Sequence, residues 1–186
     1  MVKKSACVFI SGKGSNLKNL IFKSRDYNFP INIKLVISNK KSAYGLSYAK
    51  RNSIPYFVVD TNLSNYENKI LMALRKYKIN FICLAGFMKI LSPYFLNYFK
   101  NKIINIHPSL LPKYKGLNTH KRALKAKEKF SGCTIHYVSK KLDSGKIIAK
   151  KKVKIFKKDT LKELEKRVLK EENKFYPIIL EKLIRS

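Results

Sequence analysis

Short apolar runs alternate with stretches of helical period along most of this chain, and that alternation constrains the fold more than any other feature. Runs of this length suit buried strands, whereas the segments between them space their apolar residues as one face of a helix requires. The expected strands are 6–10, 31–37, 56–59, 81–84 and 103–106, and the expected helices are 16–23, 43–51, 66–77, 93–100 and 120–127. Such alternation predicts a doubly wound α/β sheet whose strands are mostly parallel.

The last third of the chain departs from this pattern. Two strands, 133–138 and 147–155, follow each other without a helix and are joined by a turn at Leu142-Asp143-Ser144-Gly145. We therefore expect them to be antiparallel, with an exposed edge at 153–155 where apolar and polar residues alternate. Thr160 and Glu163 form a capping box that begins a final long helix reaching towards Leu183. No linker or repeat divides the chain, so we expect a single domain over 1–186.

The net charge of +30 invites an interpretation as a nucleic-acid-binding protein. Only six of the 41 basic residues are arginine, so 41 − 6 = 35 are lysine, and they are scattered along the whole chain. Abundant lysine, isoleucine, asparagine, tyrosine and phenylalanine are what codon drift in an AT-rich genome would produce. A groove selected for nucleic acid would use more arginine for bidentate contacts with phosphate and guanine. We therefore favour a solvated basic surface that attracts anionic substrates over a nucleic-acid partner.

The cysteines and the apolar runs narrow the class of protein further. Cys7, Cys83 and Cys133 lie far apart in apolar, strand-like segments, which is typical of reduced core thiols and not of metal ligands. We therefore expect no metal site. The longest apolar runs, such as 81–87, are too short to span a bilayer, and the N-terminus lacks the apolar core of a signal peptide. A cytoplasmic protein with no membrane partner is expected.

Ligands of doubly wound sheets bind beyond the carboxyl ends of the strands, so the loops after Ile10, Leu84, Ile106 and Val138 are the candidate sites. The first loop, 11–16, contains two glycines and opens a helix. A tight turn with outward-facing N–H groups, next to a helix N-terminus, suits a single phosphate. The loop lacks the ending of a Walker loop and the full dinucleotide fingerprint, so a plain strand-to-helix turn is an open alternative.

Asn105 and His107 face the same side of a strand at its carboxyl end. An amide and an imidazole that converge there would stabilise an oxyanion, although a structural histidine is an alternative. Asp143 is compatible with a simple Asx turn, but close to His107 it would favour the imidazolium form and accept protons from a nucleophile. His136 is either a core histidine or a partner of these groups, and His120 is expected to be solvated or to cap a helix.

Four motifs, in this order, resemble the phosphoribosylglycinamide formyltransferase family over nearly the whole chain. They are Ile10-Ser11-Gly12-Lys13-Gly14-Ser15-Asn16-Leu17, Leu84-Ala85-Gly86-Phe87-Met88-Lys89-Ile90-Leu91-Ser92-Pro93, the run from Asn105 to Leu117, and Leu142-Asp143-Ser144-Gly145. The resemblance implies a Rossmann-like formyltransferase fold. It implies an enzyme that transfers the formyl group of 10-formyltetrahydrofolate, its co-substrate, to the amine of 5'-phosphoribosylglycinamide in de novo purine biosynthesis. Both substrates are small molecules, and no metal is implied.

The same resemblance implies roles for individual residues. Asn105, His107 and Asp143 match the catalytic trio of the family. The ribonucleotide would be held by the phosphate loop in the N-terminal half and by one glutamate near the ribose, that is by Gly14, Ser15, Asn16 and Glu172. The folate pocket, assigned with the trio to the C-terminal half, would be lined by Met88, Lys89, Ile90, Leu91, Asn105 and Val138.

Other functions stay open at this point. A methionyl-tRNA formyltransferase shares the folate core and would suit a basic surface, but such enzymes carry a C-terminal domain for which 186 residues leave no room. A formyltetrahydrofolate hydrolase would usually carry an additional N-terminal regulatory domain. A non-catalytic nucleic-acid-binding module is the alternative that the sequence favours least. Tight RNA binding with a steep dependence on salt would support it. Either a monomer or a homodimer is compatible with the sequence.

Overall fold

The computed structural model describes residues 3–185. Its strands are β1 (Lys4–Ile10), β2 (Ile31–Ser38), β3 (Tyr56–Val58), β4 (Phe81–Leu84), β5 (Ile103–His107), β6 (Phe130–Tyr137) and β7 (Ile147–Lys154). Its helices are α1 (Ser15–Ser24), α2 (Gly45–Arg51), α3 (Tyr66–Lys76), α4 (Pro93–Tyr98), α5 (Thr119–Lys125) and α6 (Leu161–Arg185). Every element expected from the sequence is present, with bounds shifted by a few residues. Within this range, no helix has the length and apolar character needed to cross a bilayer.

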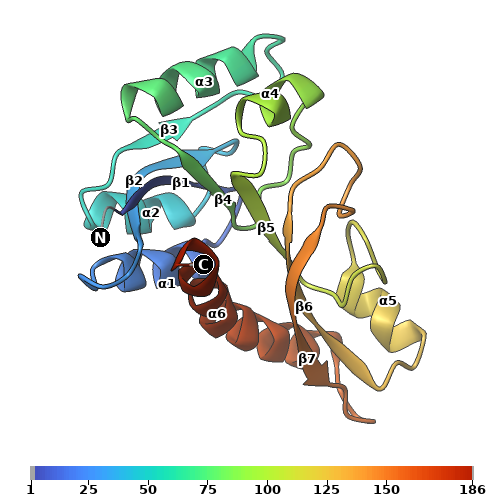
Figure 1. Cartoon of the computed structure of the whole chain (residues 1–186). Helices are drawn as coiled ribbons and strands as arrows, with labels where there is room; N and C mark the ends of the chain where they lie inside the picture. Colours follow the sequence, from blue (N-terminus) through green and yellow to red (C-terminus); the bar gives the residue numbers. More distant parts are fainter. Residues whose placement is uncertain (1–2, 186) are drawn as a thin grey trace.

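In the described part of the chain, seven strands form one sheet in the order β3-β2-β1-β4-β5-β6-β7. β1 pairs in parallel with β2 and β4, β2 with β3, and β4 with β5, whereas β6 is antiparallel to both β5 and β7. The prediction of a doubly wound, mostly parallel sheet with antiparallel strands near the C-terminus is confirmed. The final long helix is confirmed as α6, which runs alongside α1 (Figure 1).

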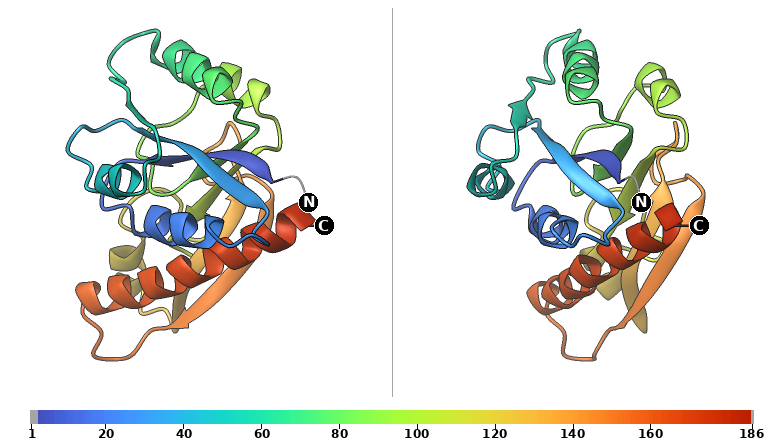
Figure 2. Two further views of the ribbon diagram at one scale, coloured as in Figure 1. Left: turned by 90° about the vertical axis from the view of Figure 1, so that its left-hand side faces the viewer. Right: turned by 60° about the vertical axis from the view of Figure 1, so that its left-hand side comes forward.

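β1 lies at the centre of the sheet, and its side chains from Ala6 to Ile10 are 0% exposed. Since alternate side chains of a strand point to opposite faces, Ala6, Val8 and Ile10 pack on the side of α1, α2 and α6. Cys7 and Phe9 pack on the side of α3 and α4. Figure 2 shows the resulting three layers, with α1 and α6 on one side of the sheet and α3 and α4 on the other.

The strand order reverses between β1 and β4, because the chain first builds outward to β3 and then returns to the other side of β1. The loops at such a point diverge and leave a crevice for a ligand. Here the two loops are also tied together. The backbone N–H of Met88 donates to Oγ of Ser11 at 2.7 Å, and the Ser11 hydroxyl donates to Oδ1 of Asn39 at 2.5 Å. The end of β1 is thereby fixed against the loop that follows β4.

The loop after β1 depends on a close contact between two glycines. Gly14 has a φ of +71°, and a Cβ added there would lie 2.5 Å from Cα of Gly45 at the start of α2. The N–H of Gly45 also donates to the carbonyl oxygen of Gly12 at 3.0 Å. Any side chain at Gly14 would push α2 away, so this glycine serves packing as well as the turn.

The cysteines are free and buried, which confirms the prediction of reduced core thiols. Burial raises the pKa of Cys83 and of Cys133 to about 12, so both thiols stay protonated and unreactive near neutral pH. Among residues 3–185, no three or more histidine, cysteine, aspartate or glutamate side chains are grouped so as to hold a metal ion.

Tyr176 anchors α6 to the sheet through a buried hydroxyl. Its Oη lies 3.0 Å from the carbonyl oxygen of Leu84 and 3.3 Å from that of Ile104. Tyr176→Phe keeps the ring but removes this donor from two buried carbonyls, so the free energy of unfolding should fall by about 1–3 kcal/mol. Urea denaturation measures the change. Tyr27→Phe, at an exposed ring, is the matched control, and equal losses in the two variants would contradict the assignment.

Candidate active site

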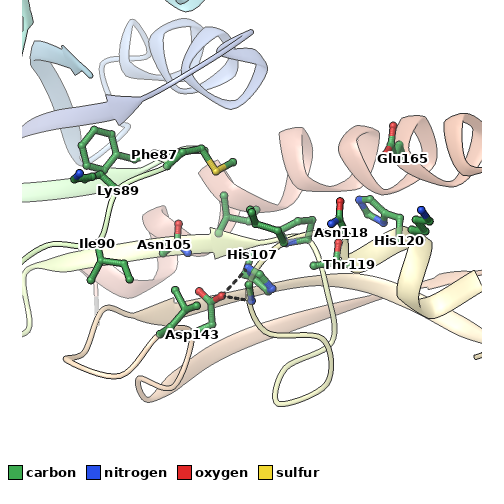
Figure 3. Close-up of a pocket in the computed structure, with 18 of the residues that line it drawn as sticks. Phe87, Lys89, Ile90, Asn105, His107, Asn118, Thr119, His120, Asp143 and Glu165 are labelled. Atoms are coloured by element: carbon green, nitrogen blue, oxygen red, sulfur yellow. Dashed lines mark hydrogen bonds and ion pairs between the residues drawn. The ribbon is translucent and has the colours of Figure 1, made fainter. Parts of the chain in front are cut away.

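A cavity of about 840 Å³ opens at the carboxyl ends of β4 and β5. Its walls come from the loop after β4, the end of β5, segment 116–121, the turn at 142–143 and the first turns of α6 (Figure 3). The strand order reverses next to β4, so the cavity lies where the topology predicts a ligand site.

Asn105, His107 and Asp143 meet at the wall of this cavity. Asn105 and His107 are two residues apart on β5 and therefore project to the same side, while Asp143 reaches them from the turn between β6 and β7. Nδ1 of His107 lies 3.3 Å from Oδ2 of Asp143, with side chains that are 7% and 8% exposed. Because solvent screens such a pair weakly, the contact is a strong local electrostatic feature.

Both ring nitrogens of His107 face hydrogen-bond acceptors. Nε2 lies 2.9 Å from the carbonyl oxygen of Tyr114, and Nδ1 faces the Asp143 carboxylate. A neutral imidazole donates from only one nitrogen, whereas an imidazolium donates from both. Only an imidazolium would satisfy both acceptors at once, and the Asp143 carboxylate would then balance its charge.

Asp143 is held in place by the segment that covers His107. The N–H of Gly116 donates to Oδ2 of Asp143 at 2.9 Å, and Nζ of Lys115 donates to Oγ of Ser144 at 2.5 Å. Asp143 itself has a φ of +45°, a left-handed conformation that aspartate tolerates in turns. The turn is thus joined to segment 115–116 at two points, and the carboxylate cannot swing outward without breaking these bonds.

His136 positions the amide of Asn105, its partner in the β5–β6 register. Nδ1 of His136 lies 2.9 Å from the carbonyl oxygen of Tyr137, so this nitrogen carries the hydrogen. Nε2 is then an acceptor, and Nδ2 of Asn105 donates to it at 3.3 Å. Burial lowers the pKa of His136, which keeps this acceptor available near neutral pH. Of the two interpretations open from the sequence, the contacts favour His136 as a partner of the candidate trio.

The residues predicted to line the folate pocket divide into two groups. Met88, Lys89 and Ile90 follow β4 and lie on the cavity wall with exposed side chains. Leu91 is instead buried in the hydrophobic cluster on the α3 and α4 side of the sheet, and Val138 packs against the same cluster. These two residues support the wall from behind and do not line the cavity.

The residues predicted to hold the ribonucleotide lie outside this cavity. Gly14 is the N-cap of α1, and Ser15 and Asn16 are its first two residues. Nδ2 of Asn16 donates to Oε2 of Glu172 at 3.0 Å across the contact between α1 and α6, so the structure brings this predicted pair together. Oδ1 of Asn16 is buried and has no hydrogen-bond partner among the described residues. A buried acceptor beside Glu172 therefore lacks a donor within the described residues.

Two kinds of residue at the site were missed from the sequence. Tyr114 and Gly116 act through backbone atoms, for which side-chain chemistry gives no signal. His120 and Glu165 line the far end of the cavity from α5 and α6 (Figure 3). Burial lowers the pKa of His120, and the nearby Glu165 carboxylate acts in the opposite direction. The packing of α5 near the start of α6, which a sequence pattern does not reveal, brings His120 to this wall.

The sheet order, the buried histidine–carboxylate contact and the loop motifs together define a class of enzyme. Residues 4–180 match the family described as formyl transferase. The match spans nearly all of the sequence, so the chain belongs to the formyl transferase family.

Two curated proteins and one crystal structure show which members of this family the chain is similar to. The chain is 43% identical over 181 residues to phosphoribosylglycinamide formyltransferase of Haemophilus influenzae. The aligned region covers 95% of this chain and 85% of that protein. The chain is 40% identical over 183 residues to the human trifunctional purine biosynthetic protein adenosine-3, covering 96% of this chain but only 18% of that protein. The crystal structure of phosphoribosylglycinamide formyltransferase from Brucella melitensis is similar with a TM-score of 0.94 at 40% identity, covering 99% of this chain and 97% of that one.

Glu172 makes the stability of the protein depend on pH. Burial raises the pKa of its carboxyl from 4.5 to about 7, against the smaller opposing effect of the Asn16 amide. Between these two values the folded protein holds a proton that the unfolded chain has released. The contribution of Glu172 to stability is therefore greatest below about pH 4.5 and is lost as the pH rises through about 7. This difference in the pKa of Glu172 between the unfolded and the folded protein corresponds to roughly 3 kcal/mol of stability.

Glu172→Gln should remove this dependence, because the amide keeps the shape of the side chain without a titrating proton. Urea denaturation of both proteins between about pH 5 and pH 8 should show a steeper loss of stability in the original protein. Glu171→Gln, at the neighbouring and more exposed carboxylate, is the matched control and should leave the slope unchanged. Parallel slopes for the original protein and Glu172→Gln would show that the carboxyl is not buried as described.

Proposed function

We propose that this protein transfers the formyl group of 10-formyltetrahydrofolate to the amine of 5'-phosphoribosylglycinamide, in de novo purine biosynthesis. The observation that carries the proposal is the buried 3.3 Å contact between His107 and Asp143, beside Asn105 on one cavity wall. The names of the relatives from Haemophilus influenzae and Brucella melitensis support the same reaction. Residues 1–186 would act as a single formyltransferase domain, with the phosphate loop in the N-terminal half and the trio in the C-terminal half.

The dimensions and lining of the cavity fit the folate co-substrate. A volume of about 840 Å³ lies within the usual range of sites for small organic ligands. Exposed apolar side chains of Met88 and Ile90 offer a surface for a flat ring system, and Lys89 beside them offers a cation for an acid group. Leu91 and Val138, packed behind this wall, would keep its shape.

The ribonucleotide would bind beside the N-terminus of α1. The turn at Gly14, Ser15 and Asn16 presents backbone N–H groups to a phosphate. Asn16 and Glu172 together suit ribose hydroxyls, because the unsatisfied Oδ1 of Asn16 would accept a hydrogen bond and a protonated Glu172 carboxyl would donate one. In this arrangement the amine of the substrate would extend from α1 towards the trio.

The trio would stabilise the charge that develops during transfer. When the amine attacks the formyl carbon, the formyl oxygen becomes an oxyanion. Asn105 has one amide hydrogen bonded to His136, so its second hydrogen is available for this oxygen. Nε2–H of His107 would turn from the Tyr114 carbonyl to the same oxygen, a stronger acceptor because it carries the charge.

Proton transfer completes the reaction without net gain or loss of protons. The attacking amine releases one proton, and the folate nitrogen that leaves takes up one. Asp143 would keep His107 protonated while the charge develops and would relay the proton through water. The protein thus supplies orientation and electrostatics, and the folate carrier supplies the activated formyl group.

An assay of formyl transfer tests the proposal. The protein is mixed with 10-formyltetrahydrofolate and 5'-phosphoribosylglycinamide, and release of the folate product is followed by absorbance. We expect His107→Ala and Asp143→Asn each to lower the rate by about 10²–10³, whereas Asp26→Asn, in an exposed turn, leaves it unchanged. Release that does not need the ribonucleotide would contradict the proposal and indicate a hydrolase.

His136 should act on the rate through Asn105. His136→Phe keeps a ring but removes the acceptor at Nε2, so kcat should fall by about five- to tenfold as the amide loses its orientation. His136→Gln restores an acceptor and should recover part of the loss. A purely structural role would instead make the rates of the two variants follow their measured stabilities.

A further inference from the structure

A second hollow, of about 650 Å³, lies between segment 110–114, the turn at 126–130 and β7. We call it the lysine cleft, after the five lysines on its walls: Lys113, Lys127, Lys129, Lys150 and Lys152. It shares no lining residue with the cavity at Asn105, His107 and Asp143. It is therefore a separate site, and its chemistry is not used by the formyl-transfer mechanism.

The alternation of β7 directs two of these lysines into the cleft. Lys151 points to the opposite face of the hairpin, where Nζ lies 3.9 Å from Oε2 of Glu171 on α6. Val153 is buried on that same face. Lys150 and Lys152 therefore stand on the face that borders the cleft, with their Cα atoms about 7 Å apart.

The positive charge of the lysine cleft is largely uncompensated. Glu128 is the single carboxylate on its walls, and it is already bound to Nζ of Lys113 at 2.7 Å and to Oη of Tyr114 at 2.8 Å. The other four lysines form no ion pair among residues 3–185: Lys127, Lys129, Lys150 and Lys152. Cations that converge on one concavity raise its potential and favour an anion with more than one charge.

An aromatic ring lies beside these cations. The Phe130 side chain is 47% exposed at the rim of the cleft, and Nζ of Lys152 lies 5.9 Å from the centroid of its ring. Phe130 and Lys154 are paired in the β6–β7 register, which places the ring on the same face as Lys150 and Lys152. A half-exposed phenyl ring next to lysines offers a stacking surface together with charge.

We propose that the lysine cleft binds a nucleoside polyphosphate, with its phosphates at Lys150 and Lys152 and its base on Phe130. The spacing of the two lysines matches a short chain of phosphates, for which lysine acts as a point charge. The cleft is bounded by segments 110–114 and 126–130 and has the volume of a site for one small ligand, so a single nucleotide fits it better than an extended polynucleotide. The proposal does not depend on the formyl-transfer function.

Isothermal titration calorimetry with ATP at about 0.15 M salt tests the site. We expect saturable binding that the double variant Lys150→Gln, Lys152→Gln weakens by about tenfold or more, since each lysine contributes a charge-assisted contact. The matched control is Lys151→Gln, Lys170→Gln, which removes the same charge at residues that do not line the cleft, one on the opposite face of β7 and one on α6. Its affinity for ATP should stay within about twofold of the original, as expected for lysines outside the contact.

A second comparison separates nucleoside from phosphate recognition. Phe130→Ala should weaken ATP by at least about fivefold through lost stacking and leave inorganic tripolyphosphate unchanged. Equal affinity for both ligands, with no effect of Phe130→Ala, would overturn the proposal and leave a plain polyanion site. Undiminished ATP binding by Lys150→Gln, Lys152→Gln would overturn it as well, because the nucleotide would then bind elsewhere. An oligoribonucleotide that binds more tightly than ATP and depends on the same lysines would assign the cleft to RNA.

Discussion

The buried contact between His107 and Asp143 is the interaction on which the arrangement of the site depends. Both side chains are almost inaccessible to solvent, so neither could stay there as an isolated charge without a large desolvation cost. The fold meets this requirement by supplying the Gly116 N–H to the carboxylate and the Tyr114 carbonyl to the second ring nitrogen. Segment 110–116 therefore covers His107 and Asp143, and its backbone supplies their remaining hydrogen-bond partners.

The sequence predicted the fold well because its strongest signals come from burial on both faces of the sheet. Residues 6–10 of β1 are all apolar and buried, and a helix with one buried face would not leave five consecutive residues covered. The weakest expectations were the bounds, as at β6, which begins at Phe130 although Gly132 lowers its strand propensity. Pairing with β7 over 130–136 overrides that preference, and pairing between strands is a tertiary property.

Site residues could be predicted where their side chains stand at the ends of strands. They could not be predicted where their position depends on how the loops and strands pack. Asn105 and His107 could be placed together from their spacing on one strand, and Asp143 was added by the resemblance of its motif to a family. The sequence could not show that Leu91 faces the core while Met88 faces the cavity, because the loop after β4 has no period. Nor could it decide the role of His136, which follows from the antiparallel register of β5 and β6.

Tyr114 connects the two hollows of the molecule. Its carbonyl oxygen is the acceptor at Nε2 of His107, and its hydroxyl binds Glu128 in the lysine cleft. The guanidinium carbon of Arg122 lies 5.2 Å from the centroid of the same ring and holds it from α5. Lys113 and Tyr114 both donate to Oε1 of Glu128, so the backbone segment that accepts from His107 is also fixed at the wall of the lysine cleft.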